Sequence, residues 1–179
     1  MTWDAYNRRK TTLREALTIV DRRRDLTITD LLDRVDPRRE AFEDEDAFLL
    51  ELQMTWFQRL SGQLDRSAGE TGSTPERTAI TTWIDTAAQL PGARAVLDDN
   101  LDAPALAKGL TNERIMMAAV SGVPMHHPDA ADHGRRIIDV ARDQAVYPII
   151  DGDVVLTDES PTSLRFSGFV SRLKSALAA

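Results

Sequence analysis

The residues best suited to bind a metal ion gather in one short segment. The sequence MHHPDAADH, residues 125–133, contains all three histidines of the chain together with two aspartates. Asp129 and His133 are four residues apart, so on a helix they would share one face and could reach the same ion. The spacing matches no zinc signature, and a loop followed by Asp129 as a helix N-cap accounts for the same residues. We therefore predict no metal site, with binding by His126, His127 and His133 as the alternative.

Other catalytic chemistry finds little support in the sequence. The carboxylates of DGDVVLTDE, residues 151–159, lack the spacing and the closing glutamate of a calcium loop. Asp151-Gly152 stands between two β-branched runs, which predicts a short β-hairpin over residues 147–156. The chain has no cysteine, no glycine-rich phosphate loop and no nucleophile elbow. We predict that the protein is not an enzyme and needs no cofactor.

Arginines near the N-terminus could contact phosphate groups. Residues 1–40 contain ten Lys/Arg and eight Asp/Glu and so have a net charge of +2. Because the whole chain has a net charge of −7, the remaining residues have a net charge of −9. A basic head on an acidic body is typical of a DNA-binding domain joined to a ligand-binding or dimerisation domain. A solvated helix face rich in arginine would give the same excess.

Helical periodicity runs through most of the chain and predicts a mainly α fold, with the hairpin at 147–156 as its one β element. Residues 66–76 read as a linker that ends in Thr74-Pro75, a helix start with proline at the first helical position. The predicted helices cover approximately residues 13–20, 27–35, 46–64, 75–90, 92–100, 103–122, 131–145 and 166–177. No stretch reads as a signal peptide or a membrane span, so we predict a soluble cytoplasmic protein.

Two segments resemble parts of the TetR-like transcriptional regulators. TITDLLDRV, residues 27–35, is similar to the short second helix of their helix-turn-helix domain, and FEDEDAFLLELQMTW, residues 42–56, to the start of their long fourth helix. Further on, residues 74–106 resemble part of their ligand-binding body. The resemblance covers residues 8–120. It implies a TetR-like helical bundle, with a small N-terminal unit over residues 1–45 and a ligand-binding and dimerisation body over residues 46–179.

The chain departs from the family where DNA would be read. Only Asp36-Pro37-Arg38-Arg39-Glu40-Ala41 separates the second helix from Phe42, about one helical turn less than a recognition helix needs. Pro37 could start a single helical turn. The acidic residues 43–46 follow directly and would repel a phosphate backbone. If DNA is bound, the resemblance implies that Thr27, Arg38 and Arg39 contact it, through a shortened surface with weak or lost affinity.

The resemblance also implies a ligand pocket and a homodimer. The large side chains of the body would either line a cavity for a small apolar ligand or form ordinary core. These candidate pocket residues are Trp56, Phe57, Trp83, Met116 and Met117. Two apolar stripes near the C-terminus would pair in an isologous dimer. They consist of Ile137, Ile138 and Ala141, and of Phe166, Phe169, Val170, Leu173 and Leu177.

Two functions from different classes follow. The first is a TetR-like regulator, or a degenerate relative of one with weak or lost DNA binding, that acts through a partner or a small apolar ligand. The alternative is a helical protein–protein interaction module that binds neither DNA nor ligand. The sequence identifies no operator, ligand or partner.

Overall fold

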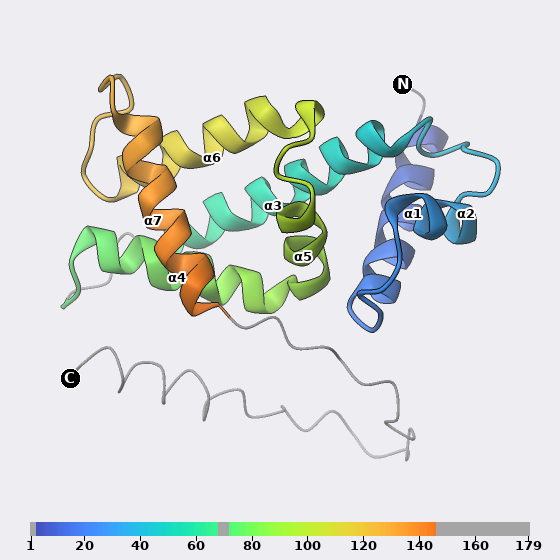
Figure 1. Cartoon of the computed structure of the whole chain (residues 1–179), viewed down its shortest axis with the longest axis horizontal. Helices are drawn as coiled ribbons and strands as arrows, with labels where there is room; N and C mark the ends of the chain where they lie inside the picture. Colours follow the sequence, from blue (N-terminus) through green and yellow to red (C-terminus); the bar gives the residue numbers. More distant parts are fainter. Residues whose placement is uncertain (1–2, 68–71, 146–179) are drawn as a thin grey trace, which may run out of the picture.

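A computed structural model describes residues 3–67 and 72–145, and this part of the chain is mainly α-helical, as predicted (Figure 1). The α-helices are α1 (Trp3–Val20), α2 (Ile28–Val35), α3 (Glu45–Ser67), α4 (Pro75–Gln89), α5 (Pro91–Asp99), α6 (Ala107–Val120) and α7 (Ala130–Gln144), and the 3-10 helix η1 (Pro104–Leu106) precedes α6. No strand occurs within the described ranges, and the predicted hairpin at 147–156 lies outside them.

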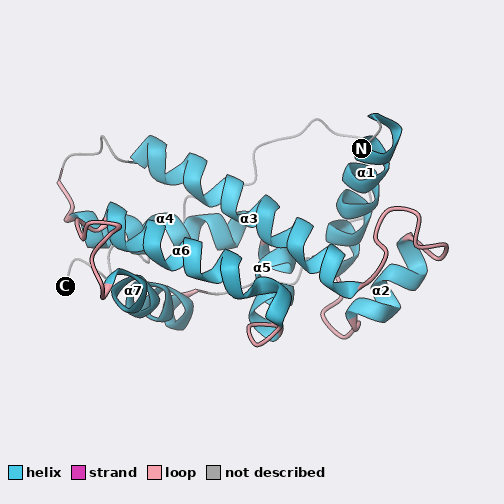
Figure 2. Cartoon of the chain, turned by 90° about the horizontal axis from the view of Figure 1, so that it is seen from above, coloured by secondary structure: helices cyan, strands magenta, loops and turns pink. Residues whose placement is uncertain are grey.

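The first two helices lie at one end of the long helix α3, and α6 and α7 lie toward the other end (Figure 2). Helix α1 buries Leu13, Ala16 and Val20, which follow the spacing of one helix face. Phe42, fully buried, contacts the ring of Phe48 edge-on at a centroid distance of 5.4 Å. This aromatic pair anchors the segment that joins α2 to α3.

Local signals in the sequence fix where several helices begin and end. The Thr74 side chain caps α4, and Pro75 occupies the first helical position, where its missing N–H group is harmless. Leu90 ends α4 and Pro91 begins α5, as the Pro91-Gly92 break predicts. A carboxylate from the turn after α1 also contributes, because Asp21 Oδ1 accepts the Gly92 N–H at 2.8 Å. This bond ties the end of α1 to the start of α5.

Helices α6 and α7 pack so closely that one position has no room for a side chain. A Cβ atom on Gly134 of α7 would lie 1.7 Å from the carbonyl oxygen of Arg114 in α6. Glycine is therefore required by the approach of two backbones rather than by an unusual φ angle.

One of the two predicted dimerisation stripes is wrong. Ile137, Ile138 and Ala141 are buried at 2%, 3% and 0% exposure within the chain's own core, where α7 packs on α4 and α6. The periodicity identified the apolar face of α7 but not its partner, because a stripe looks the same whichever helix covers it. The second stripe, residues 166–177, lies outside the described residues. None of the described helices is long and apolar enough to cross a membrane.

Candidate functional site

The segment between α2 and α3 forms a loop closed around one buried carboxylate. Residues 36–44 contain turns but no helix, so the single helical turn that Pro37 could have started does not form. Asp36 is 6% exposed, and its carboxylate accepts the backbone N–H groups of Glu40, Ala41 and Phe42 at 2.9, 2.9 and 2.8 Å. These bonds give the backbone N–H groups of the loop a partner that a helix would otherwise have to supply. The loop is therefore stable without forming a helical turn.

The conformation of Arg39 completes the loop. Its φ angle of 51° lies in the left-handed region, which few residues other than glycine adopt. Its N–H donates to the Asp36 carbonyl at 2.9 Å. A backbone that turns here cannot continue as a helix directed into a DNA groove.

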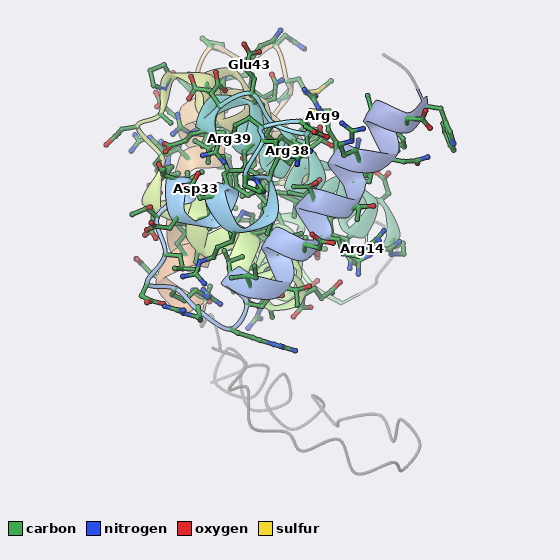
Figure 3. The ribbon with its side chains drawn as sticks, turned by 90° about the vertical axis from the view of Figure 1, so that its right-hand side faces the viewer. Arg9, Arg14, Asp33, Arg38, Arg39 and Glu43 are labelled. Atoms are coloured by element: carbon green, nitrogen blue, oxygen red, sulfur yellow. The ribbon has the colours of Figure 1, made fainter. Side chains whose placement is uncertain are left out.

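Three arginines of this region lie near carboxylates of the same chain, among them Arg39 beside Asp33 (Figure 3). Arg39 Nη2 lies 2.7 Å from Asp33 Oδ1, and Arg8 Nη1 lies 2.7 Å from Glu40 Oε2. Arg38, with 85% of its side chain exposed, lies 3.9 Å from the other oxygen of Glu40. The charges of Arg8 and Arg39 are therefore paired within the protein, whereas Arg9 contacts the Ala41 carbonyl and Arg38 stays mostly exposed.

Thr27, the third candidate for DNA binding, caps α2. Its hydroxyl oxygen accepts the Asp30 N–H at 3.1 Å and donates to Asp30 Oδ2 at 2.7 Å, and its backbone N–H donates to the same carboxylate at 3.3 Å. This is a capping box. The hydroxyl and N–H of Thr27 lower the pKa of Asp30, so the carboxylate stabilises the fold above its ordinary pKa and that contribution is lost as pH falls through the lowered value.

We expect Thr27→Ala to destabilise the protein by about 1 kcal/mol, because α2 loses its N-cap. The pKa of Asp30 should rise toward its ordinary value in this variant. Urea unfolding measures the first effect and an NMR titration of the carboxyl carbon the second. Thr11→Ala, at an exposed position in α1, is the matched control and should change neither quantity appreciably. Equal unfolding midpoints for both variants would show that the cap contributes nothing.

Thr27 also borders a groove of about 300 Å³ between the N-terminal helices and α5. The groove is lined by Leu26, Thr27, Ile28, Glu45, Val96, Asp99 and Asn100. Its wall is part polar and part apolar, and its one threonine hydroxyl is already used by the cap. Thr27 therefore acts as a helix cap, although it also lines this groove.

The five candidate pocket residues separate into two groups. Trp56, Trp83 and Met117 are fully buried, and the two indole rings meet edge-on at a centroid distance of 5.4 Å. Phe57 and Met116 are only half-buried. Phe57 follows Trp56 directly, so helix geometry turns it about 100° away from the core. The structure thus brings the two tryptophans together and leaves Phe57 on another face.

Both tryptophans donate hydrogen bonds to one buried carboxylate. The indole N–H groups of Trp56 and Trp83 each lie 2.9 Å from Glu113 Oε1, and Gln53 Nε2 lies 3.2 Å from Glu113 Oε2. Glu113 itself has no exposed surface. A buried charge of this kind needs an opposite charge nearby.

Arg94 supplies that charge. Its side chain is fully buried, with Nη1 3.7 Å from Glu113 Oε1 and the guanidinium carbon 4.7 Å from the ring centroid of Trp56 and 5.5 Å from that of Trp83. On its other side, Nε donates to Asp98 Oδ1 at 3.1 Å, and Nη2 lies 2.8 Å from the same oxygen without being aligned for a hydrogen bond. Arg142 Nε donates to the same Asp98 oxygen at 2.8 Å.

We call Gln53, Trp56, Trp83, Arg94, Asp98, Glu113 and Arg142 the buried polar network. It combines side chains from α3, α4, α5, α6 and α7, and its two arginines balance its two carboxylates. Arg94 lies over both indole rings, where an aromatic-lined pocket would hold a ligand. The geometry supports a structural role for Trp56 and Trp83 rather than a site for a small apolar ligand.

The three histidines do not converge. His133 Nε2 lies 3.1 Å from Ser121 Oγ, and its Nδ1 lies 3.3 Å from Arg136 Nη2. His127 Nδ1 accepts the Asp129 N–H at 3.2 Å. Within the described residues, no group of three or more His, Cys, Asp or Glu side chains could hold a metal ion.

Sequence reasoning missed the two buried carboxylates, Asp36 and Glu113. One signal for Glu113 was present, because it lies between Leu110 and Met117 on a face that is otherwise apolar. A charged residue at such a position is either buried with a partner or marks a break in the stripe. Asp36 gave no comparable signal, since an Asp-Pro pair is common in any turn.

Comparison with known proteins gives no match for this chain. No known protein family, no curated protein and no solved structure is similar to it at a significant level.

Proposed function

We propose that this protein is a degenerate relative of the TetR-like regulators that no longer reads DNA and acts by binding another protein. The proposal combines the sequence resemblance over residues 8–120 with one observation, the closure of residues 36–44 around Asp36. This loop stands where the resembled family has its recognition helix, and its backbone N–H groups are used by the Asp36 carboxylate. A surface without that helix has no element to place in the major groove.

Electrostatics support the same conclusion. Non-specific DNA binding depends on cations that are free to replace counterions at the phosphates. Arg8 and Arg39 instead lie 2.7 Å from carboxylates of their own chain. The exposed acidic residues 43–46 follow at once. A duplex approaching this end of the molecule would have to displace internal ion pairs and face four carboxylates.

A protein partner is favoured over a small apolar ligand. The aromatic residues suited to line a pocket donate to Glu113 and enclose Arg94, so an apolar ligand there would have to displace a buried cation from its carboxylates. Exposed apolar side chains occur instead on the surface, where a protein can cover them.

Fluorescence anisotropy with a labelled random-sequence 30-base-pair duplex tests the loss of DNA binding. We expect a dissociation constant no tighter than about 10⁻⁴ M at physiological salt, the weak end of non-specific binding. The double variant Arg38→Ala/Arg39→Ala should bind as the wild type does. A working DNA surface would instead lose affinity and show a salt slope shallower by about two units, one for each lost phosphate contact.

Arg135→Ala/Arg136→Ala is the matched control, because it removes two adjacent arginines from α7 and changes the net charge equally. A genomic binding selection provides the stronger test. Recovery of a palindromic site bound tightly at physiological salt, with affinity lost in the 38/39 variant and kept in the 135/136 variant, would refute the proposal.

A further inference from the structure

Helix α3 carries an apolar stripe on the face opposite its core-facing residues. Leu50, Met54 and Phe57 follow the i, i+4, i+7 spacing of one helix face, and Ser61 continues it by one turn. Leu50 is 47% exposed and Met54 54%, whereas Leu52 on the opposite face has no exposed surface. A surface helix normally places charged residues on its outer face, so this stripe is suited to bind another apolar surface.

Exposed carboxylates lie at both ends of the stripe. Asp46 precedes Leu50 by four residues and Asp65 follows Ser61 by four, so both share the face of the stripe. Asp46 is also the last of four exposed acidic residues, 43–46. We call the stripe and these carboxylates the α3 outer face. It fits an occupant with an apolar centre and positive charges toward its ends, because like charges would repel there.

The last twenty residues of the chain, 160–179, have this composition, although they lie outside the described residues. The segment contains Arg165, Arg172 and Lys174 and no Asp or Glu, so its side chains have a net charge of +3. Because the whole chain has a net charge of −7, residues 1–159 have a net charge of −10. The apolar spacing predicts a helix over 166–177. Its stripe consists of Phe166, Phe169, Val170, Leu173 and Leu177.

We propose that residues 160–179 bind to the α3 outer face of their own chain, as a basic amphipathic helix antiparallel to α3. The two stripes have the same length, since residues 50–61 and 166–177 each span about 17 Å at 1.5 Å per residue. The antiparallel alignment of these stripes also sets the large Phe166 against the small Ser61, so that a large side chain meets a small one.

The distribution of charge selects the antiparallel direction. Arg172 and Lys174 lie in the second half of the predicted helix, and this direction brings that half toward the acidic run 43–46. Arg165, at the other end of the helix, then lies toward Asp65. Two cations thus face the larger group of carboxylates and one cation faces the single carboxylate, which favours this direction over the parallel one.

The chain is long enough to bring the segment to this face. Helices α4 and α6 each contact both α7 and α3, and α6 lies between them in Figure 2. The axes of α7 and α3 are therefore about 20 Å apart, twice the usual distance between packed helices. If residues 147–156 form the predicted hairpin, the nine residues 157–165 still span about 30 Å when extended. Without the hairpin the reach is larger.

The covalent connection favours the chain's own segment over that of another copy. A segment joined to its site by a short tether meets it at an effective concentration on the order of millimolar. At micromolar protein concentration, the segment of another copy is then disfavoured about 1000-fold. The stripe 166–177 is thereby assigned to α3 of the same chain instead of the predicted dimer. The assignment does not depend on the loss of DNA binding, and a protein partner that uses the α3 outer face must displace the segment.

Intramolecular cross-linking of the full-length protein tests the contact, because the sequence has no cysteine. In Gln58→Cys/Ser167→Cys one thiol is at an exposed position of α3 and the other is in the segment, on the same side of the proposed contact. We expect a short bis-maleimide to join the two thiols within one chain, giving a product of monomer mass.

Val140→Cys/Ser167→Cys is the matched control, since Val140 is 42% exposed on α7. Ser167 is 27 residues from Val140 but 109 from Gln58, so random encounter would favour the control pair. We expect the pair at 58 and 167 to react at least about tenfold faster than the control, because docking raises its effective concentration. An equal or slower rate, or a main product of twice the mass, would overturn the proposal.

Charge reversal tests the direction of the segment. Arg172→Glu/Lys174→Glu should lower the equilibrium constant for docking about tenfold, because attraction to the acidic run becomes repulsion. Cross-linking between positions 58 and 167 should slow accordingly. Adding Glu43→Lys/Asp46→Lys to this protein should restore most of the rate, since opposite charges then face each other again.

Arg135→Glu/Arg136→Glu is the control for charge reversal, because it reverses two adjacent arginines on α7. It should leave the cross-linking rate unchanged. Circular dichroism of each variant verifies that the helices are retained. An equal loss of rate in this control, or no recovery when residues 43 and 46 are reversed, would contradict docking in the proposed direction.

Discussion

Replacing Arg94 with methionine is expected to destabilise the protein by about 3–5 kcal/mol, the usual effect of leaving a buried charge without its partner. Methionine has similar length and can lie over the two indole rings as Arg94 does, so loss of charge rather than loss of volume dominates. Glu113 would keep its hydrogen bonds from Trp56 and Trp83 but would have no cation nearby. Urea unfolding followed by circular dichroism measures the change.

A second substitution separates the charge effect from packing. In Arg94→Met/Glu113→Gln both side chains of the ion pair are uncharged. The new amide oxygen can still accept both indole N–H groups. Its NH₂ group can donate to Gln53 Oε1, which has no partner in the native protein, once the Gln53 amide turns over. We expect the second change to restore about 2 kcal/mol of the loss. Additive losses from the two single variants would show that Arg94 and Glu113 are not coupled.

Gly134→Ala should also cost about 3 kcal/mol or more, at the upper end of what overpacking a core usually costs. The added methyl group would lie 1.7 Å from the carbonyl oxygen of Arg114. A flexible side chain could turn away, but a helix backbone cannot, so α6 and α7 must separate. The thermal midpoint should fall accordingly, and loosening of Met117 and Ile137 at the interface should increase hydrogen exchange in both helices.

Gly62→Ala is the matched control for this prediction. Gly62 also lies inside a helix, α3, but an added Cβ there would meet no atom within 4 Å. Alanine is the better helix former by about 0.5–1 kcal/mol, so this variant should be as stable as the wild type or slightly more stable. Similar destabilisation at both positions would contradict the close approach of the α6 and α7 backbones at Gly134.

Local signals made most of the described fold predictable. The apolar spacing on α3 and the Thr74-Pro75 start of α4 placed those helices to within a few residues. Helix α1 was the main shortfall, since it begins at Trp3 and not near Leu13. Its first turns bury almost no apolar surface, so periodicity carries no information there. These turns are instead held by contacts that Arg8, Arg9 and Lys10 make with residues distant in the sequence.

The candidate site was less predictable, because its interactions join residues far apart in the sequence. Arg94 and Glu113 are 19 residues apart, and Trp56 and Glu113 are 57 apart. Single-sequence patterns identify which residues face inward but not which of them meet. They identified Trp56 and Trp83 correctly as inward-facing, yet could not show that one carboxylate accepts both indole N–H groups and that an arginine lies over both rings. The role of Arg38 and Arg39 depended similarly on Asp33 and Glu40.

The buried polar network also limits how the sequence can drift over evolutionary time. A lineage that lost either Arg94 or Glu113 would pass through an intermediate with a lone ion in its interior, which selection would remove. Natural variants should therefore keep both residues or exchange both for neutral ones. Asp98 and Arg142 retain 18% and 23% side-chain exposure, so water can compensate for the loss of one of them. Among diverged relatives, positions 94 and 113 are expected to covary strongly, and positions 98 and 142 to vary more independently.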